Sequence, residues 1–265
     1  MTTTIQSPVA LVRNGNVARI ILNRPEAANA IDIATANALL DTVLRVEEDD
    51  TVRCVVLTGA GKLFCGGGDV ASFASAGGEL PTLLKQLTGP LHAAINRMLR
   101  MPKPLVVAVN GTSAGAGLGL SLIGDIVIAV QSAKFVPAYG AIGLTADGGL
   151  TWLLPRLIGM RRAQEMMMTN RSVSAEEAVR WGLITRAVEA EVFEQDIQET
   201  AERLAASPVR AIGRLRSLLL SSHTNAVETQ MELEAATMAQ CGRDVEAQEG
   251  IAAMLQKRKA DFSLL

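Results

Sequence analysis

Two glycine-rich turns, each directly after an apolar run, constrain the fold of this chain more than any other feature. The first turn spans residues 64–69 after the apolar run 54–57, and the second spans 110–117 after the run 105–109. Each pattern predicts a strand that ends in small residues and opens a helix. Glycine lets the backbone come close to a ligand and adopt positive φ, and free N–H groups at a helix start favour negative charge. We therefore expect two such turns, brought together, to form a cradle of two N–H donors for a developing oxyanion.

Strand and helix patterns alternate through the first half of the chain. Asn14-Gly15 between two apolar runs is typical of a β-hairpin turn. Apolar residues at helical spacing predict a helix over 32–48, with Asp32 as its N-cap. The alternation predicts an α/β fold with a layered core. The expected elements are strands at 9–13, 17–22, 53–57, 105–109 and 126–130 and helices at 32–48, 80–99 and 116–123.

Beyond residue 150 the pattern predicts helices. Ser174 and Glu177, three residues later, are typical of a capping box at the start of one of them. The residues after 206 have no strand on which to pack, and a layer of helices with apolar faces needs a partner surface. We expect this layer either to fold back on the core or to pack between subunits. The expected helices span 161–168, 174–181, 191–206, 209–220, 225–240 and 244–259.

Composition argues against several classes of function. The 25 basic and 27 acidic residues give a net charge of −2, and aromatic residues make up 3%, so no footprint for nucleic acid is visible. Three separated cysteines and only two histidines argue against a disulfide scaffold or a metal centre. No run approaches the ~20 apolar residues that span a bilayer, and the N-terminus lacks a signal-peptide pattern. We therefore expect a cytoplasmic globular protein that binds neither nucleic acid nor membrane.

Several short segments, in order along nearly the whole chain, resemble the crotonase (enoyl-CoA hydratase/isomerase) superfamily. Each segment alone is a weak signal, whereas their combination in this order is specific. The resemblance implies an α/β fold built as a spiral of ββα units over residues 1–200, with a helical trimerisation region over 201–265. The segments are Asn23-Arg24-Pro25-Glu26, residues 57–61, the two glycine turns, Gly143-Leu144 before Asp147-Gly148-Gly149, residues 159–163 and 175–183, and the tail at 249–251 with 257–259.

This resemblance also implies a substrate and a site. The substrate is an acyl-CoA thioester, so coenzyme A enters as part of the substrate, and no metal or nicotinamide cofactor is expected. The family motif places the two N–H donors for the thioester oxygen on Gly68 and Ala116, which agrees with the cradle expected from the turns. It also implies a homotrimer or a dimer of trimers. Further substrate contacts are expected at Gly66, Asp69, Val70, Gly115, Gly119 and Tyr139.

The chain departs from the hydratases of this family at both catalytic positions. Gly119 and Tyr139 stand where those enzymes carry the two glutamates that add water to a double bond. A glycine moves no proton, and an unperturbed tyrosine, with a pKa near ~10, is a poor base at neutral pH. The remaining carboxylate is Asp147, in a stretch similar to the 1,2-epoxyphenylacetyl-CoA isomerase branch and to some enoyl-CoA isomerases and aryl-CoA dehalogenases. In those relatives an aspartate at this place is a base or a nucleophile, so the resemblance favours an isomerase in which Asp147 shuttles a proton.

Three other interpretations stay open at this point. Asp147 before a glycine also fits a helix N-cap or a turn. Residues 111–115 fit the G-x-S-x-G pattern of the α/β-hydrolase nucleophile elbow, and Ser113, Asp147 and His223 follow in the order of a Ser/Asp/His esterase triad. The third interpretation is a protein that binds acyl-CoA without turning it over. The surroundings of Asp147 and His223 in the fold bear on all three.

Overall fold

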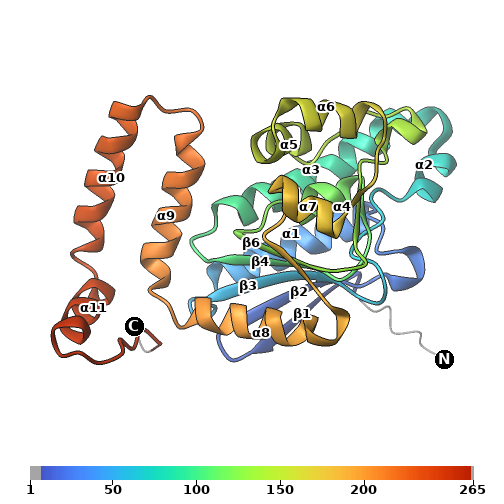
Figure 1. Ribbon diagram of the computed structural model, residues 1–265. Helices are drawn as coiled ribbons and strands as arrows, with labels where there is room; N and C mark the ends of the chain where they lie inside the picture. Colours follow the sequence, from blue (N-terminus) through green and yellow to red (C-terminus); the bar gives the residue numbers. More distant parts are fainter. Residues whose placement is uncertain (1–6, 264–265) are drawn as a thin grey trace, which may run out of the picture.

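The computed structural model describes residues 7–263, and its core is built on a six-stranded sheet (Figure 1). The first two strands form the predicted antiparallel hairpin, with Gly15 at φ +55°, and the remaining neighbours are parallel. Strands β3 and β4 are buried along their whole length, as parallel strands covered on both faces are. The strand order is β1 (Val9–Asn14), β2 (Val17–Leu22), β3 (Cys54–Gly59), β4 (Leu105–Val109), β6 (Ile126–Val130) and β9 (Arg186–Val188).

Helices cover both faces of this sheet. Figure 1 shows α8 on one side and α1 with α3 on the other. The start of α1 is the predicted one, because the Asp32 carboxylate accepts a hydrogen bond from the Thr35 backbone N–H at 2.7 Å. The predicted capping serine is confirmed too, since Ser174 Oγ accepts from the Glu177 N–H at 3.2 Å. The bounds are α1 (Ile33–Glu48), α3 (Leu80–Arg100), α7 (Ala175–Trp181) and α8 (Ala190–Ala205).

A second, three-stranded sheet begins within the second glycine turn, with the order β5 (Ser113–Ala114), β7 (Lys134–Val136) and β8 (Val173–Ser174). Strands β8 and β9 correct the expectation of helices alone after residue 150. They are only two and three residues long, too short for an alternating pattern to show in the sequence. Four short helices complete the core: α2 (Val70–Ala76), α4 (Ala116–Ser121), α5 (Leu150–Ile158) and α6 (Met160–Met168).

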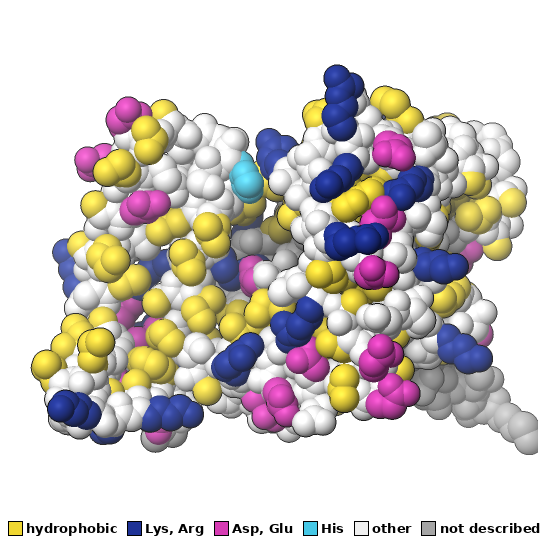
Figure 2. All heavy atoms as spheres, in the orientation of Figure 1, with side chains coloured by type: hydrophobic (Ala, Val, Ile, Leu, Met, Phe, Trp, Pro, Cys, Tyr) yellow, Lys and Arg dark blue, Asp and Glu magenta, His cyan; other side chains and the backbone are white. Residues whose placement is uncertain are grey.

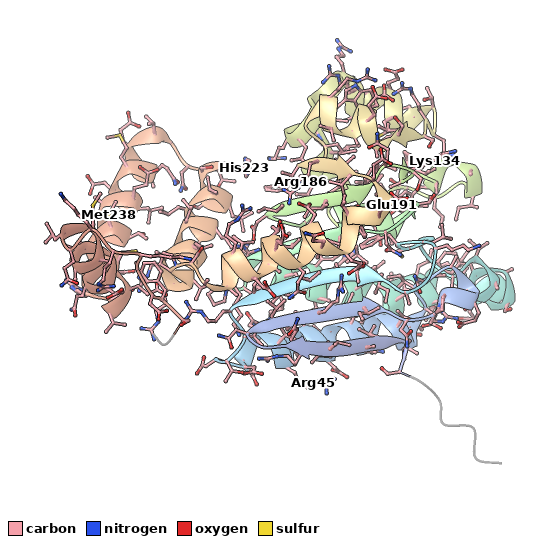
Figure 3. The ribbon with its side chains drawn as sticks, turned by 60° about the horizontal axis from the view of Figure 1, so that its bottom comes forward. Arg45, Lys134, Arg186, Glu191, His223 and Met238 are labelled. Carbon is pink, nitrogen blue, oxygen red and sulfur yellow. The ribbon has the colours of Figure 1, made fainter. Side chains whose placement is uncertain are left out.

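The last three helices, α9 (Val209–Ser222), α10 (Val227–Cys241) and α11 (Val245–Leu255), stand beside the core, and we call them the arm (Figure 1). No residue of α10, all of which the structure describes, is buried. Figure 2 shows hydrophobic side chains gathered over the arm, and in Figure 3 Met238 lies on the side away from the core. The exposed large apolar residues of the arm are Leu215, Leu219, Val227, Met231, Leu233, Met238, Val245, Ile251, Met254 and Leu255.

Polar contacts join the arm to the core. The buried Arg216 of α9 donates from Nη2 to the Met98 carbonyl at 2.9 Å, from Nη1 to the Met101 carbonyl, and from Nε to Asp125 at 2.8 Å. Its guanidinium therefore closes the carboxyl end of α3, where a cation is favourable. Within the arm, the buried carboxylate of Glu246 accepts from the backbone N–H groups of residues 210 and 211 at the start of α9. The arm thus meets the core through α9.

Two more buried cations close helix ends in the same way. Lys103 donates from Nζ to the Val46 and Asp49 carbonyls at 2.7 Å, at the end of α1. Arg53 donates to the Ala205 carbonyl at 2.7 Å, at the end of α8. Both line a cavity of about 540 Å³ between core and arm, beside the amino ends of β3 and β4, whereas the glycine turns follow the carboxyl ends of these strands. The boundary predicted at residue 200 falls inside α8, which contacts the sheet, and the two-part division remains a prediction.

Candidate active site

The first glycine turn leads from β3 to α2 and presents one backbone donor. The Ile31 N–H donates to the Gly67 carbonyl at 2.7 Å, and the Asp69 N–H donates to the Ile31 carbonyl at 3.0 Å. These bonds form a parallel bridge, so the peptide groups of Gly68 point to the opposite side. Within residues 7–263, nothing accepts a hydrogen bond from the Gly68 N–H. The turn therefore leaves this donor available to a ligand.

The second turn presents a matching donor at the start of α4. Gly115 precedes the helix at φ +51°, and its own N–H is used by the Val136 carbonyl at 3.0 Å. Ala116 is the first residue of α4, where an N–H has no partner inside the helix, and none of the described residues accepts from it. A Cβ on Gly67 would lie 3.0 Å from the Ala114 carbonyl oxygen. The two turns therefore touch backbone to backbone, as the cradle hypothesis requires.

Both turns open into a cavity of about 420 Å³, which we call the turn cavity. Most of its wall is apolar, and Tyr139 and Asp147 bring polar groups to it. Cavities of this size and character are typical of small-molecule sites. Its lining residues are Gly66, Gly67, Gly68, Val70, Phe73, Leu84, Leu87, Thr88, Gly115, Ala116, Ala138, Tyr139, Ala141, Ile142, Leu144, Thr145, Ala146 and Asp147.

Asp147 is the carboxylate of the turn cavity, and two side chains hold it. The Tyr139 hydroxyl donates to Oδ1 at 2.6 Å, and Nε2 of His92 lies 3.2 Å from Oδ2. The same nitrogen accepts a hydrogen bond from the Gly148 N–H at 3.0 Å. The residue before α5 is Gly149, and no side chain caps that helix. The N-cap interpretation of Asp147 is therefore wrong, because its carboxylate faces a phenol and an imidazole. The turn interpretation holds for its backbone, since the Leu150 N–H donates to the Asp147 carbonyl at 3.1 Å.

Tyr139 keeps its proton at this position. Burial raises the pKa of its phenol, and the neighbouring Asp147 carboxylate raises it further. The hydroxyl is therefore a donor to Asp147 over the whole neutral range. In this structure it does not have the properties of a proton acceptor.

Two of the predicted substrate contacts lie off the cavity wall. The Asp69 carboxylate accepts from the Ser72 N–H at 3.1 Å, which caps α2, and pairs with Arg24 at 3.1 Å. Gly119 lies inside α4, and a Cβ there would stand 3.2 Å from the carbonyl oxygen of Gly148. The turn that carries Asp147 therefore occupies the space beside position 119. The other predicted contacts, Gly66, Val70, Gly115 and Tyr139, line the cavity.

The structure does not assemble the predicted esterase triad. Ser113 is fully buried, and its hydroxyl has no hydrogen-bond partner in the described part of the chain. His223 ends α9 and packs edge-on against Trp152, with ring centroids 5.1 Å apart. The imidazole beside Asp147 belongs to His92 instead. The hydrolase interpretation is therefore wrong, because its serine faces no base and its histidine faces an indole.

Sequence reasoning missed His92 as a site residue. It lies on α3, 55 residues before Asp147, and no motif connects the two. Only the packing of α3 beside the 143–149 loop brings them together. Phe73, Leu84 and Leu87 were missed for the same reason, because helical spacing marks them as apolar without indicating which surface they line.

Two kinds of feature are absent from the described residues. No group of three or more His, Cys, Asp and Glu side chains within 7–263 could hold a metal ion. Across the same residues, no helix combines the length and the apolar character needed to cross a membrane.

Comparison with known proteins gives consistent matches over nearly the whole chain. Residues 12–264 match the family described as enoyl-CoA hydratase/isomerase. The 1,2-epoxyphenylacetyl-CoA isomerase of Escherichia coli (strain K12) is 39% identical over 93% of this chain and 95% of its own. The 4-chlorobenzoyl coenzyme A dehalogenase-2 of an Arthrobacter species is 32% identical over 85% of this chain and 82% of its own.

A solved structure supports the same relationship. The enoyl-CoA hydratase of Polaromonas sp. JS666 aligns with a TM-score of 0.91 and 30% identity, covering 96% of this chain and 98% of that one. The expected α/β fold of the crotonase type, with its C-terminal helices, is thereby confirmed.

Proposed function

Because this chain belongs to the enoyl-CoA hydratase/isomerase family, we propose that it isomerises an acyl-CoA thioester, using Asp147 to move the proton. One observation carries the proposal. A single carboxylate lines the turn cavity together with both glycine turns, while the two positions that bear glutamates in hydratases hold Gly119 and Tyr139.

The cradle supplies the electrostatic part of the reaction. The N–H groups of Gly68 and Ala116 have no acceptor among the described residues, so both are available to the thioester oxygen. Removal of an α- or γ-proton converts the thioester into an enolate, whose negative charge lies on this oxygen. Fixed donors aimed at such a charge contribute about 2.7–4 kcal/mol each to the transition state.

Asp147 supplies the proton transfer. Its Oδ1 is fixed by the Tyr139 hydroxyl at 2.6 Å, and Oδ2 faces His92. A carboxylate held in this way accepts the proton from one carbon and returns it to another, so the overall reaction needs no external acid, metal or nicotinamide. Positioned general bases of this kind contribute roughly 10²–10⁴-fold in rate.

Two features support isomerisation over hydration. Tyr139 cannot replace a glutamate, because burial and Asp147 both raise the pKa of its phenol. A side chain at position 119 would compete for space with the Gly148 carbonyl, 3.2 Å from where its Cβ would stand. The two-carboxylate arrangement of hydratases is therefore replaced here by one aspartate.

The contact between Asp147 and His92 favours one second candidate, substitution at an aryl-CoA. In that reaction a carboxylate oxygen attacks a halogen-bearing ring carbon, halide leaves, and water then hydrolyses the aryl ester. An imidazole next to the carboxylate is the usual activator of such a water. Halide release from a 4-halobenzoyl-CoA, with no release by Asp147→Asn, would favour this candidate.

Proton exchange tests the main proposal. In heavy water, NMR should show deuterium entering acyl-CoA substrates beside the thioester in the presence of the enzyme. Exchange by the wild type and its loss in Asp147→Asn are the expected results. Binding of acyl-CoA without exchange for any substrate tried would favour the binding-only interpretation.

The arm supports a further proposal, a homotrimer or a dimer of trimers. Met231, Met238 and Met254 are among ten large apolar residues exposed on its three helices, and such a surface needs covering. Light scattering at working concentration should give three or six times the chain mass. A stable, active monomer would contradict it.

A further inference from the structure

A second cavity lies next to the turn cavity. It measures about 330 Å³ and is bounded by α3, α5 and the arm helix α9. Its wall is mixed: Ile95, Leu99, Trp152, Leu153 and Leu220 give it an apolar part, and His92, Asn96 and Arg100 a polar part. Neither the cradle nor the carboxylate of Asp147 belongs to this wall, so the chemistry proposed above does not use it.

The two cavities are in line along the same two walls. On α3, Leu87 and Thr88 line the turn cavity, and His92, one turn further on, lines the second cavity. On the loop before α5, Asp147 lines the turn cavity and Gly148 lines the second. Along α3 the lining changes from the turn cavity to the second cavity between Thr88 and His92, and along the loop it changes between Asp147 and Gly148.

The His92 side chain connects the two walls at the point where the two cavities meet. His92 reaches from α3 to the loop, where Nε2 lies 3.2 Å from Asp147 Oδ2 and accepts from the Gly148 N–H at 3.0 Å. This nitrogen serves one of the two contacts at a time, as donor to Asp147 or as acceptor from Gly148, and either contact ties the ring to the loop. The imidazole is thus a partition, and its side chain remains 43% exposed.

We propose that His92 limits the length of the acyl group, and that the second cavity is a closed extension of the acyl site. The proposal rests on the acyl-CoA function proposed above and concerns which acyl groups fit. In the wild type, an acyl chain that passes Asp147 meets the imidazole. With the ring removed, the same chain enters the second cavity between α3 and α5, where Ile95, Leu99 and Leu153 offer it apolar contacts.

Binding of straight-chain saturated acyl-CoAs tests this without any turnover. Calorimetry with a series of increasing length should show wild-type affinity rising by about fourfold per buried methylene and then levelling off or falling. In His92→Ala the rise should continue. A chain four carbons beyond the wild-type limit should bind His92→Ala at least tenfold more tightly than it binds the wild type.

Further variants distinguish loss of the His92 partition from a general loosening of the fold. Gln86→Ala shortens an exposed side chain on the same helix, outside both cavities, and should keep the wild-type limit. His92→Asn is smaller than histidine and still offers an acceptor to Gly148, so it should also extend the limit and carries the test if His92→Ala does not fold. Adding Leu99→Trp to either His92 variant should fill the second cavity and restore the limit.

The outcomes are distinct. Equal affinity of the wild type for short and long chains, or an unchanged limit in the His92 variants, would overturn the partition alone. Failure of the wild type to bind acyl-CoA of any length would overturn the proposed function, and this inference with it.

Discussion

The core and the arm of this molecule treat their apolar residues in opposite ways. In the core, β3 and β4 are buried along their whole length, and both glycine turns rest against neighbouring backbone. In the arm, Met238 and Met254 are 74% and 82% exposed, and α10 buries nothing within the described chain. The core therefore covers most of its apolar side chains with its own helices and strands, whereas the arm leaves an apolar surface that this chain does not cover.

The join between the two regions includes directional polar contacts. Arg216 of α9 bonds to two carbonyls at the end of α3 and to Asp125, and the His223 ring packs edge-on against Trp152 of the core. Hydrogen bonds are directional, whereas apolar contacts are not. These directional contacts orient α9 on the core, and the exposed face of the arm therefore has a defined position relative to the core.

The largest expected effect comes from a change confined to the core. Asp147→Asn keeps the size of the side chain and an acceptor for the Tyr139 hydroxyl, but it cannot take a proton from carbon. We expect kcat to fall by roughly 10²–10⁴-fold, with oligomeric state and thermal midpoint unchanged. Asp41→Asn, on the exposed side of α1, is the control. Equal turnover by Asp147→Asn and this control would remove Asp147 from the mechanism.

The second largest expected effect tests the oxyanion cradle formed by the two turns. Ala116→Pro deletes one N–H donor at the first residue of α4, a helix position that accepts proline. Loss of an oxyanion donor should lower kcat by about 10²–10³-fold, while circular dichroism stays that of the wild type. Gly68 is the poorer target, because a Cβ there would stand 2.5 Å from the Phe73 ring. A folded Ala116→Pro enzyme with normal turnover would exclude the cradle.

A change at the join should affect both regions together. Arg216→Met leaves Asp125 and the carbonyls of Met98 and Met101 without their partner. Breaking a buried pair costs about 3–5 kcal/mol, and we expect the lower end because Asp125 is 33% exposed. Denaturant unfolding measures this loss. Arg180→Met removes a surface cation that is 65% exposed and should cost far less. Equal losses in the two variants would mean that Arg216 does not hold the arm.

The smallest effect is a pH dependence at the end of the arm. Both oxygens of Glu249 accept from Arg258, at 2.6 and 2.8 Å, and these bonds lower the pKa of Glu249 from 4.5 to about 2. The pair therefore stabilises the fold fully above pH 4.5 and loses this contribution as the pH falls towards 2. The thermal midpoint of Glu249→Gln should lie below that of the wild type at neutral pH and converge with it near pH 2.

A matched variant separates that effect from general acid unfolding. Glu232 is exposed on α10, and no described residue pairs with it. Glu232→Gln should follow the wild-type midpoint at every pH. A gap between Glu249→Gln and the wild type that persists at pH 2 would contradict the assignment.

Local patterns predicted the fold class and part of the site. Each glycine turn is contiguous in sequence and follows a strand, so both turns and the cap at Asp32 could be predicted without knowledge of packing. Asp147 differs, because its candidacy came from the family resemblance of its stretch and not from a local pattern. Helical periodicity located the arm helices but could not indicate that α10 stays uncovered, because an apolar stripe looks the same whether its partner lies within the chain or outside it.

The rest depends on packing that no local pattern records. His92 reaches Asp147 only because α3 runs beside the loop that follows residue 143. The family resemblance placed Tyr139 where hydratases carry a glutamate, whereas its role as a donor to Asp147 follows from the distance of 2.6 Å between the two. Strands of two or three residues, such as β8 and β9, contain too few side chains for alternation to show.

The glycine at position 119 couples this position to the loop that carries Asp147. Its missing side chain leaves room for the Gly148 carbonyl, which belongs to the same turn as Asp147. A single Gly119→Glu substitution would therefore push on the loop that positions the aspartate before the new carboxylate could serve. A side chain at position 119 therefore acts on the aspartate as well, because its Cβ requires the Gly148 carbonyl to shift by a few tenths of an ångström.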